Sequence, residues 1–396
     1  MITDETIAIV VERITPQLVD LRRTLHEHPE LAFEEHETGR AIASYLSELR
    51  IPFRTGVGKT GIVATLAGAK PGRSIGIRAD IDALPIEEQS GVAFASKRAG
   101  RMHACGHDAH TTIALGVAHV LSSLNEQLGG TVKLIFQPAE ETLSGAAAMI
   151  ADGVLEDPRM DALVGFHNWP PLDTGVIGYH AGAVMASSDA FDIVLEGRAG
   201  HAAHPHLGVD ALVGAAQVIT ALQTVVSREI APVIPAVLTV GQIEGGVARN
   251  VIAGRVVLRG TARTLDTAAA AQVEASVRRL VENIASALRL EAEVVWRKQT
   301  PVLRNDPQLL ERVLGSVRQA IDPVNVRELG PASMGSEDFA WFGEHVPIVH
   351  LKIGSKIEGL DTAIHRSDYD CNEAAIPLAV RALTRVVLDL AQPAAS

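Results

Sequence analysis

The hydrophobic pattern of the chain changes character near residue 185. Before that point, helical patterns alternate with short apolar runs bounded by Gly, Pro and Asp, which is typical of an α/β domain with a largely buried sheet. The runs predict strands at 74–80, 131–137 and 162–167, and a further strand at 347–354 returns to the same style. A broad apolar stripe over 111–124 predicts a helix that faces the core.

Between residues 185 and 298 the pattern predicts strand, helix, strand, strand, helix and strand, at 189–197, 209–228, 236–246, 254–264, 267–290 and 291–298. This β-α-β-β-α-β order is the split βαβ arrangement of a ferredoxin-like domain. We therefore expect a mixed-sheet α/β catalytic domain formed by 1–184 and 299–396, interrupted by an inserted domain at 185–298. The last helix is expected at 374–390, and the tail 391–396 is expected to be disordered. Two chain crossings form a natural hinge, so the inserted domain is a candidate lid.

Composition narrows the class of protein. The 396 residues are long enough for two domains, with 47% hydrophobic residues, 21% charged residues and a formal net charge of −12. An acidic chain without a basic block has no means to neutralise phosphates, which argues against a nucleic-acid partner. The N-terminus has neither a basic region nor a small-residue cleavage site, and no apolar stretch reaches the ~18 residues of a membrane span. We expect a cytoplasmic protein without a membrane partner.

Metal-binding side chains follow several of the predicted strands. In an open α/β sheet, functional groups gather beyond the carboxyl ends of the strands. The residues found there, or in loops that reach the same edge, are Asp80, Asp82, Cys105, His107, Glu140, Glu141, His167 and His365. This set exceeds what one tetrahedral zinc needs, so we expect two divalent ions that share a bridging ligand. Our hypothesis puts the thiolate of Cys105 between the ions, with His107 and His167 on one and Glu141 and His365 on the other.

Glu140 and Glu141 are neighbours, and side chains of neighbouring residues in an extended segment point in opposite directions. We therefore expect Glu141 to ligate a metal ion and Glu140 to hold the attacking water. Glu140 would take a proton from that water and return it to a leaving amine. Asp82 is expected to accept a hydrogen bond from a ligand histidine and so fix its tautomer.

Each residue also has a simpler interpretation. His26 and His28 lie where Pro29 ends a helix and are interpreted as structural, and Cys371 is interpreted as a small packing residue. For His103 and His110, support of the metal ligands and simple solvation are equally good interpretations. A hydrolase with Cys105 as nucleophile is the main chemical rival, but it needs only one base and one orienting group. It would leave Glu140, Glu141, His167 and His365 without a role.

Motifs along nearly the whole chain resemble one known family. They are LRRTLHEHPELAFEEHET, GIRADIDALPIEE, MHACGHDAHTT, LIFQPAEET, GFHNWP, GHAAHPHLGVDAL, ARNVIAG, MGSEDFAWF and HRSDYD, which lie between about Leu21 and Val380. Together they resemble the aminoacylase and carboxypeptidase G family of metallopeptidases, in its hippurate hydrolase and indole-acetyl-amino-acid hydrolase branch. The resemblance implies metal ligands at Cys105, His107, Glu141, His167 and His365, with Glu140 as the catalytic base. These are the residues that the pattern itself indicates.

The resemblance also implies roles that the pattern does not indicate. His201 would reach the active site of a partner subunit and stabilise the oxyanion, which implies a homodimer or a higher homo-oligomer. Asn250 and Gly335 would contact the substrate. Departures at Arg198 and Ala199, where the branch usually has Lys and Gly, at Ala253 in place of Pro, and in HRSDYD remove no ligand. Because of these departures, the family's acyl-group preference is not carried over to this chain.

The sequence thus predicts a metal-dependent amidohydrolase that cleaves an N-acyl-amino acid, such as an N-acetyl or benzoyl conjugate, into a carboxylate and a free amino acid. Alternatives are a dipeptidase or carboxypeptidase of the same family and a metal-binding relative that has lost catalysis. Two divalent ions per subunit are expected. Thiolate and imidazole ligands favour zinc, and Mn, Co and Ni are also compatible with the set.

Overall fold

The computed structural model describes residues 2–361 and 363–393, which form two compact units. The first unit consists of Met1–Gly182, Arg304–Pro331 and Asp338–Ser396, and the second of Ala183–Leu303 and Ala332–Glu337. The second unit therefore runs slightly beyond the expected 185–298 at both ends and includes a further segment. That segment belongs to it because Ala186 N donates hydrogen bonds to the carbonyls of Ser333 and Gly335. Of the tail expected to be disordered, residues 394–396 lie outside the described residues.

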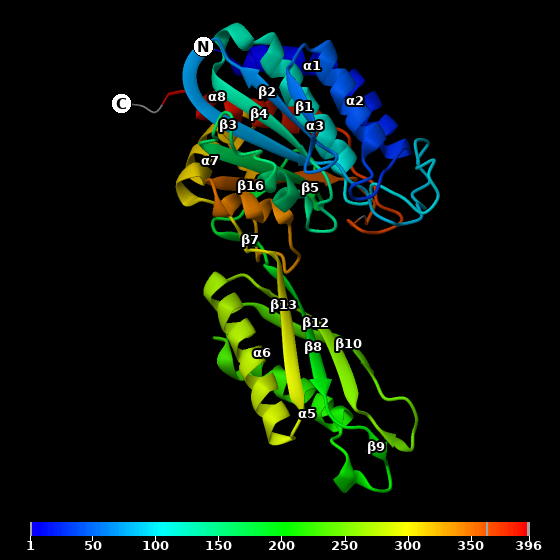
Figure 1. Ribbon diagram of the computed structural model, residues 1–396. Coiled ribbons are helices and arrows are strands. Elements are labelled where there is room, and N and C mark those ends of the chain that lie inside the picture. The colour runs from blue at the N-terminus through cyan, green and yellow to red at the C-terminus, as the bar shows by residue number, and fades with distance from the viewer. Residues whose placement is uncertain (1, 362, 394–396) are drawn as a thin grey trace. The chain divides into compact units, whose positions relative to one another are not determined.

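The first unit is built on an eight-stranded mixed sheet (Figure 1). In spatial order its strands are β1 (Phe53–Val57), β2 (Gly61–Ala67), β4 (Gly129–Gln137), β3 (Lys70–Asp80), β5 (Ala162–Asp173), β16 (Ile348–Lys356), β6 (Ile177–Tyr179) and β15 (Val326–Glu328). The central strands β4, β3, β5 and β16 are parallel, whereas β2 is antiparallel to both β1 and β4. Near-continuous apolar runs are typical of such a buried parallel centre. The expectation of a large mixed α/β sheet is confirmed.

Helices cover this sheet. They are α1 (Asp4–Glu27), α2 (His36–Glu48), α3 (His107–Ser123), α4 (Gly145–Ala151), α7 (Pro307–Ala320) and α8 (Ala375–Leu390). Short 3₁₀ segments occur at Asn125–Gln127, Pro323–Asn325 and Asp338–Glu344. Helices α1, α2, α3, α7 and α8 bury their apolar faces in one hydrophobic core with the sheet. Caps mark the starts of several helices; in α1, the hydroxyl of Thr3 accepts a hydrogen bond from Thr6 N.

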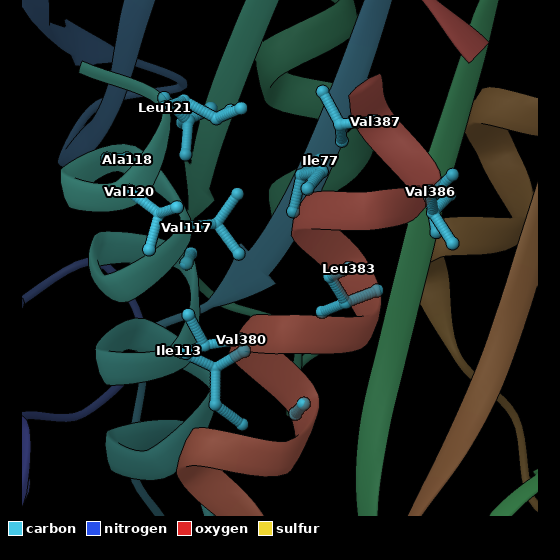
Figure 2. Close-up of a cluster of buried hydrophobic side chains, with 14 of the residues drawn as sticks. Ile77, Ile113, Val117, Ala118, Val120, Leu121, Val380, Leu383, Val386 and Val387 are labelled. Atoms are coloured by element: carbon cyan, nitrogen blue, oxygen red, sulfur yellow. The ribbon is translucent and has the colours of Figure 1, made fainter. Parts of the chain in front are cut away.

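Helices α3 and α8 pack closely beside β3, where Ile77, Val117 and Leu383 belong to one buried cluster (Figure 2). The approach depends on Gly116. A Cβ atom at this position would lie 2.6 Å from Cγ2 of Val380, well inside van der Waals contact. Glycine therefore allows α3 to reach the position from which its first turn presents side chains at the sheet edge.

The second unit contains a four-stranded antiparallel sheet of order β10–β12–β8–β13. Its main elements follow the chain as β8 (Ser188–Glu196), α5 (Ala211–Thr224), β10 (Ala236–Gly245), β12 (Arg255–Thr264), α6 (Thr267–Ala287) and β13 (Glu291–Thr300). A π-helical turn at Val225–Glu229 extends α5, and α5 and α6 share a hydrophobic core with the sheet (Figure 1). Shorter elements are β7 (Ala183–Met185), β9 (Gly200–His201), Pro205–Leu207 and β11 (Val251–Ile252). Strand β14 (Leu303–Arg304) contains the last residue of this unit and the next residue of the first unit.

One helical stretch in the described part of the chain, Ala211–Glu229, is long and apolar enough to span a membrane by length and composition. The apolar content of α5 has another explanation, because this helix packs on β8, β10 and β12 and contributes Val218 and Leu222 to the core of the second unit. A sheet-covering helix satisfies the same criterion. The stretch is therefore weak evidence for a membrane span.

Candidate metal centre

The helix that follows the Cys105 loop begins earlier than the sequence pattern predicts. Helix α3 begins at His107, four residues before the predicted position, so His107 and His110 belong to its first turn. The preceding Gly106 has a φ of 84°, and a Cβ there would lie 2.0 Å from Asn168 Nδ2. Only glycine combines this backbone with this contact, and it aims both Cys105 and His107 at the sheet edge. The hydrophobic pattern did not predict the first turn, because the residues buried there are mostly polar and give no apolar stripe.

His167 lies within β5 rather than at its end, because β5 continues to Asp173. The neighbouring strand β3 ends before β5 does along the shared sheet edge. The register pairs Arg78 with Gly165, and β3 ends two residues later at Asp80. His167 is therefore level with the carboxyl end of β3, and its side chain reaches the same edge of the sheet as Cys105.

The structure brings the five predicted metal ligands together. Their donor atoms form two groups, and within each group all atoms lie within 4.8 Å of one another. These groups are Cys105, His107 and His167, and Cys105, Glu141 and His365. Cys105 belongs to both, as expected of a bridging ligand. Cys105, His107 and His167 are buried, whereas the side chain of His365 is half exposed.

Two atoms of this cluster indicate a cation site. Among the described residues, His107 Nε2 and Glu141 Oε1 are buried without a hydrogen-bond partner, although such groups in folded proteins are nearly always satisfied. They lie 3.8 Å apart. A divalent ion would accept both lone pairs, and a donor set of thiolate, imidazole and carboxylate suits zinc and related ions. The residues present therefore fit a metal centre.

Hydrogen bonds orient the ligand histidines. His107 Nδ1 lies 3.2 Å from Asp82 Oδ1, and His167 Nδ1 lies 2.5 Å from the carbonyl of Asn168. A ring nitrogen that donates to an oxygen leaves the other nitrogen with its lone pair, so Nε2 of both rings can bind a metal. The predicted contact of Asp82 with a ligand histidine is confirmed.

Buried negative charge dominates the site. Burial opposes the charged form of His107, but Asp80 and Asp82 outweigh it and raise the pKa of this imidazole to about 10. Burial, together with the nearby Glu141 and Glu140 carboxylates, raises the pKa of the Cys105 thiol well above its usual value. The shift of His107 and the carboxylate contribution to the shift of Cys105 both come from negative charge that favours added positive charge, whether a proton or a metal cation.

Glu140 and Glu141 lie in a turn and not in the expected extended segment. Strand β4 ends at Gln137, and Ala139 and Leu143 both have a φ of 53°. Carboxylate atoms of Glu140 and Glu141 consequently lie within 4.8 Å of each other and of a nitrogen of His107. The expectation that the two side chains diverge is wrong, because alternation applies to strands. The positive φ values cost about 1–3 kcal/mol each, so surrounding contacts must maintain them.

The residues implied by the resemblance lie in the second unit. His201 on β9 pairs with Val251 on β11, and both His201 and Asn250 are exposed. Nδ1 of His201 accepts a hydrogen bond from Ala203 N at 3.1 Å. Gly335 accepts a hydrogen bond from Ala186 N at 2.8 Å through its carbonyl. Their catalytic and substrate-binding roles stay predictions.

Sequence reasoning missed Asn168. Its Nδ2 donates to the carbonyl of Cys105 at 2.8 Å, and its Oδ1 accepts hydrogen bonds from Ser355 Oγ and Tyr369 Oη at 3.0 and 2.9 Å. Its backbone N donates to His110 Nε2 at 2.8 Å. One buried amide thus joins the Cys105 loop, α3, β16 and the segment after His365. A polar residue directly after a ligand histidine within an apolar run was the available signal.

His110 and His103 are both buried, so the solvation interpretation is wrong for each. His110 Nδ1 lies 2.5 Å from Asp80 Oδ1, and its ring stacks on that of His107. Burial lowers the pKa of His103 to about 4, which keeps this ring neutral. His26 is buried and its Nδ1 lies 2.8 Å from Asp108 Oδ2, as expected of a structural residue. Cys371 is buried in a small apolar cluster, as expected of a packing residue.

The sequence matches the peptidase family M20/M25/M40 over residues 76–389. The chain therefore belongs to this family of peptidases. It is 44% identical over 345 residues to the N-acetyl-L-cysteine deacetylase of Bacillus subtilis, covering 87% of this chain and 82% of the relative. It is 41% identical over 286 residues to the N-acyl-L-amino acid amidohydrolase of Geobacillus stearothermophilus, covering 72% of this chain and 77% of the relative.

The fold has a close counterpart among solved structures. A dinuclear metal binding peptidase of the M20 family from Bacillus subtilis is similar to this chain with a TM-score of 0.83 and 34% identity. The similarity covers 95% of this chain and 98% of that protein. The mixed α/β fold and the cluster of metal-binding side chains agree with this relationship.

Proposed function

We propose that this protein is a metal-dependent amidohydrolase that cleaves N-acyl-amino acids, with an N-acetyl, benzoyl or similar acyl group, to a carboxylate and a free amino acid. The observation that carries the proposal is the pair of donor groups that share Cys105, with Glu140 beside them. Relatives named as deacetylases and amidohydrolases of acylated amino acids support the substrate class.

Two divalent ions would be held by Cys105, His107, Glu141, His167 and His365. When bound, such ions would polarise an acyl carbonyl and lower the pKa of a bound water toward neutrality. Zinc is the ion we favour, because a buried thiolate and imidazoles suit it, and Mn, Co and Ni are the alternatives.

Glu140 is the residue that transfers the proton. Its carboxylate lies within 4.8 Å of donor atoms of His107 and Glu141, in a buried position. There it accepts a proton from the attacking water and delivers it to the nitrogen of the leaving amino acid. A buried position suits a general base, because burial keeps competing bulk water away from the carboxylate. His201 of the partner subunit stabilises the oxyanion, and Asn250 and Gly335 contact the substrate.

The second unit is proposed to be a ferredoxin-like dimerisation and lid domain of a cytoplasmic enzyme. Strand β10 forms an edge of its sheet, and Val237 and Ile243 on this strand are exposed by 39% and 51%. Leu212 and Val213 at the start of α5 are exposed by 40% and 50%. An unpaired edge with exposed apolar side chains is suited to pairing with a second copy. Light scattering of the wild type and of Ile243→Lys tests this: a dimer should become a monomer.

The proposed activity is tested with purified enzyme loaded with Zn, Mn, Co or Ni and offered N-acyl-amino acids and dipeptides. We expect turnover of the acylated amino acids that a chelator abolishes and divalent metal restores. Preference for dipeptides would favour the dipeptidase alternative, chelator-resistant turnover would favour the cysteine-nucleophile alternative, and no turnover would favour a non-catalytic relative. Glu140→Gln should bind both metals and lose about 10²–10⁴-fold in kcat.

A further inference from the structure

Glu35 is a buried carboxylate that the proposed chemistry does not use. It stands directly before α2 and is 0% exposed, yet its side chain does not cap that helix. The carboxylate instead reaches into the first unit. Its Oε1 accepts a hydrogen bond from Ala139 N at 2.9 Å, and its Oε2 accepts one from Thr60 Oγ1 at 2.5 Å.

Ala139 is the residue immediately before Glu140, and its φ of 53° lies in the left-handed region. A residue other than glycine stays in this region only where its surroundings hold it there. The hydrogen bond to Glu35 fixes the peptide N–H at this strained position. Glu35 thus holds the entry to the turn that carries Glu140.

A second carboxylate holds the other side of the same turn. Asp82 Oδ2 accepts a hydrogen bond from Glu141 N at 3.0 Å. Glu140 therefore lies between two backbone N–H groups, each bound by a carboxylate from a distant segment. Within the turn, Leu143 N donates to the carbonyl of Glu140 at 2.7 Å. These contacts determine where the backbone of Glu140 lies and hence where its carboxylate can reach.

We propose that Glu35 is a positioning residue for Glu140, acting through the backbone of Ala139. A general base must lie within hydrogen-bond reach of the proton it takes, so a small displacement of this turn lowers the rate of proton transfer. The inference rests on the proposed function, in which Glu140 is the base. It adds that the base is held in place by a residue of the segment before α2.

The first test is the kinetics of Glu35→Ala and Glu35→Gln at saturating metal. Glu35→Ala should lower kcat by on the order of 10²-fold with little change in KM, because the loss concerns the transition state. Glu35→Gln keeps an oxygen that accepts from Ala139 N and should restore most of the activity. Glu30→Ala is the matched control: Glu30 is also a buried carboxylate of this segment, but it binds Glu37 N and Thr38 N.

A double-mutant cycle separates positioning from general loss of structure. In the Glu140→Gln background, Glu35→Ala should cause no further loss in kcat, because residues that act as one unit are not additive. An equal loss in both backgrounds would overturn the inference. If Glu140→Gln alone retained normal turnover, the base assignment itself would fail, which this cycle distinguishes from a failure of Glu35.

Amide hydrogen exchange gives a readout that does not depend on activity. Peptides that cover 138–145 should exchange faster in Glu35→Ala than in the wild type and in Glu30→Ala, since Ala139 N loses its acceptor. If Glu35→Ala does not fold, Thr60→Val removes only one contact of the carboxylate and should produce a smaller change in the same peptides. Unchanged exchange there in the folded variants would overturn the inference.

Discussion

Cys105 Sγ lies 3.2 Å from His167 Nε2, although 62 positions separate the two residues in the chain. The contact joins the loop before α3 to the middle of β5. Cys105 also belongs to the group with Glu141 and His365, so it is common to the two donor groups that contain the five predicted ligands, as the proposed bridging role requires.

Replacement of Cys105 by Ser should remove metal from the purified protein. The thiolate is shared by both donor groups, so its loss should lower affinity by more than the roughly 10–100-fold that follows loss of an outer partner of a ligand. Elemental analysis after dialysis measures this. Cys371→Ser is the control, because this second buried cysteine belongs to neither group and should keep the wild-type metal content. Full metal content in Cys105→Ser would contradict the bridging role.

Asn168→Ala should weaken metal binding as well as folding. The change leaves the Cys105 carbonyl and the hydroxyls of Ser355 and Tyr369 without their buried partner, at a cost of about 1–3 kcal/mol for each unsatisfied group. Metal affinity should fall roughly 10–100-fold, because the loop that carries Cys105 loses an anchor. Urea unfolding and metal titration measure the two effects.

Asn305→Ala provides the matched comparison for this prediction. Asn305 is equally buried, and its amide binds the backbone of His180 and His350. Its replacement should destabilise the fold to a similar degree and leave metal affinity unchanged. Equal loss of metal affinity in both variants would show that Asn168 acts through general stability.

The stability of the first unit should depend on the protonation of His26. Burial opposes its charged form, but the negative charge of Asp108, together with hydrogen bonds to Asp108 and Glu88, raises the pKa of His26 to about 9. A folded-state pKa above the unfolded value of about 6.5 means that the stabilisation is complete below that pH and is lost as pH rises through about 9. The contribution is on the order of 3 kcal/mol at its maximum.

Urea unfolding of the wild type and of His26→Gln at about pH 6 and about pH 9.5 measures this dependence. The free energy of unfolding should differ strongly between the two proteins at the lower pH and much less at the higher pH. A difference that does not change with pH would mean that His26 contributes by packing alone.

Two mid-helix glycines should respond in opposite ways to alanine. Gly116→Ala brings Cβ to 2.6 Å from Val380 Cγ2 and should destabilise by about 1–3 kcal/mol through overpacking of α3 against α8. Gly315→Ala in α7 meets no atom within 4 Å and should stabilise by about 0.5–1 kcal/mol, because alanine favours a helix. Thermal melting of both variants measures the contrast. A stabilised Gly116→Ala would contradict the close helix packing.

Much of the architecture could be predicted from the sequence. Apolar runs located the central strands β3, β4, β5 and β16, and helical periodicity located α8 to within one residue, because burial of a regular element leaves a local pattern. Short strands such as β9 and β11 were missed, since two residues are too few to carry a pattern.

The site was predicted less completely. The ligand types and their place at one sheet edge follow from residue chemistry and from the rule that strand ends converge. The turn that contains Glu140 and Glu141 was expected to be an extended segment, because only the backbone conformation at Ala139 and Leu143 distinguishes the two. Asn168 was overlooked although it directly follows a ligand histidine within an apolar run, because its partners lie in other segments of the chain. Glu35 carries no signal in its own neighbourhood, because its partner Ala139 lies 104 positions away.

The sequence by itself determined which elements form and which side chains can bind a metal, because periodicity and ligand chemistry are local properties of the chain. Apart from Asp82, only the tertiary structure decided which groups hold those ligands in place. Glu35 meets Ala139 across 104 positions, and Tyr369 meets Asn168 across 201. Contacts at such separations depend on how the sheet and helices pack together, and no pattern within one segment encodes them.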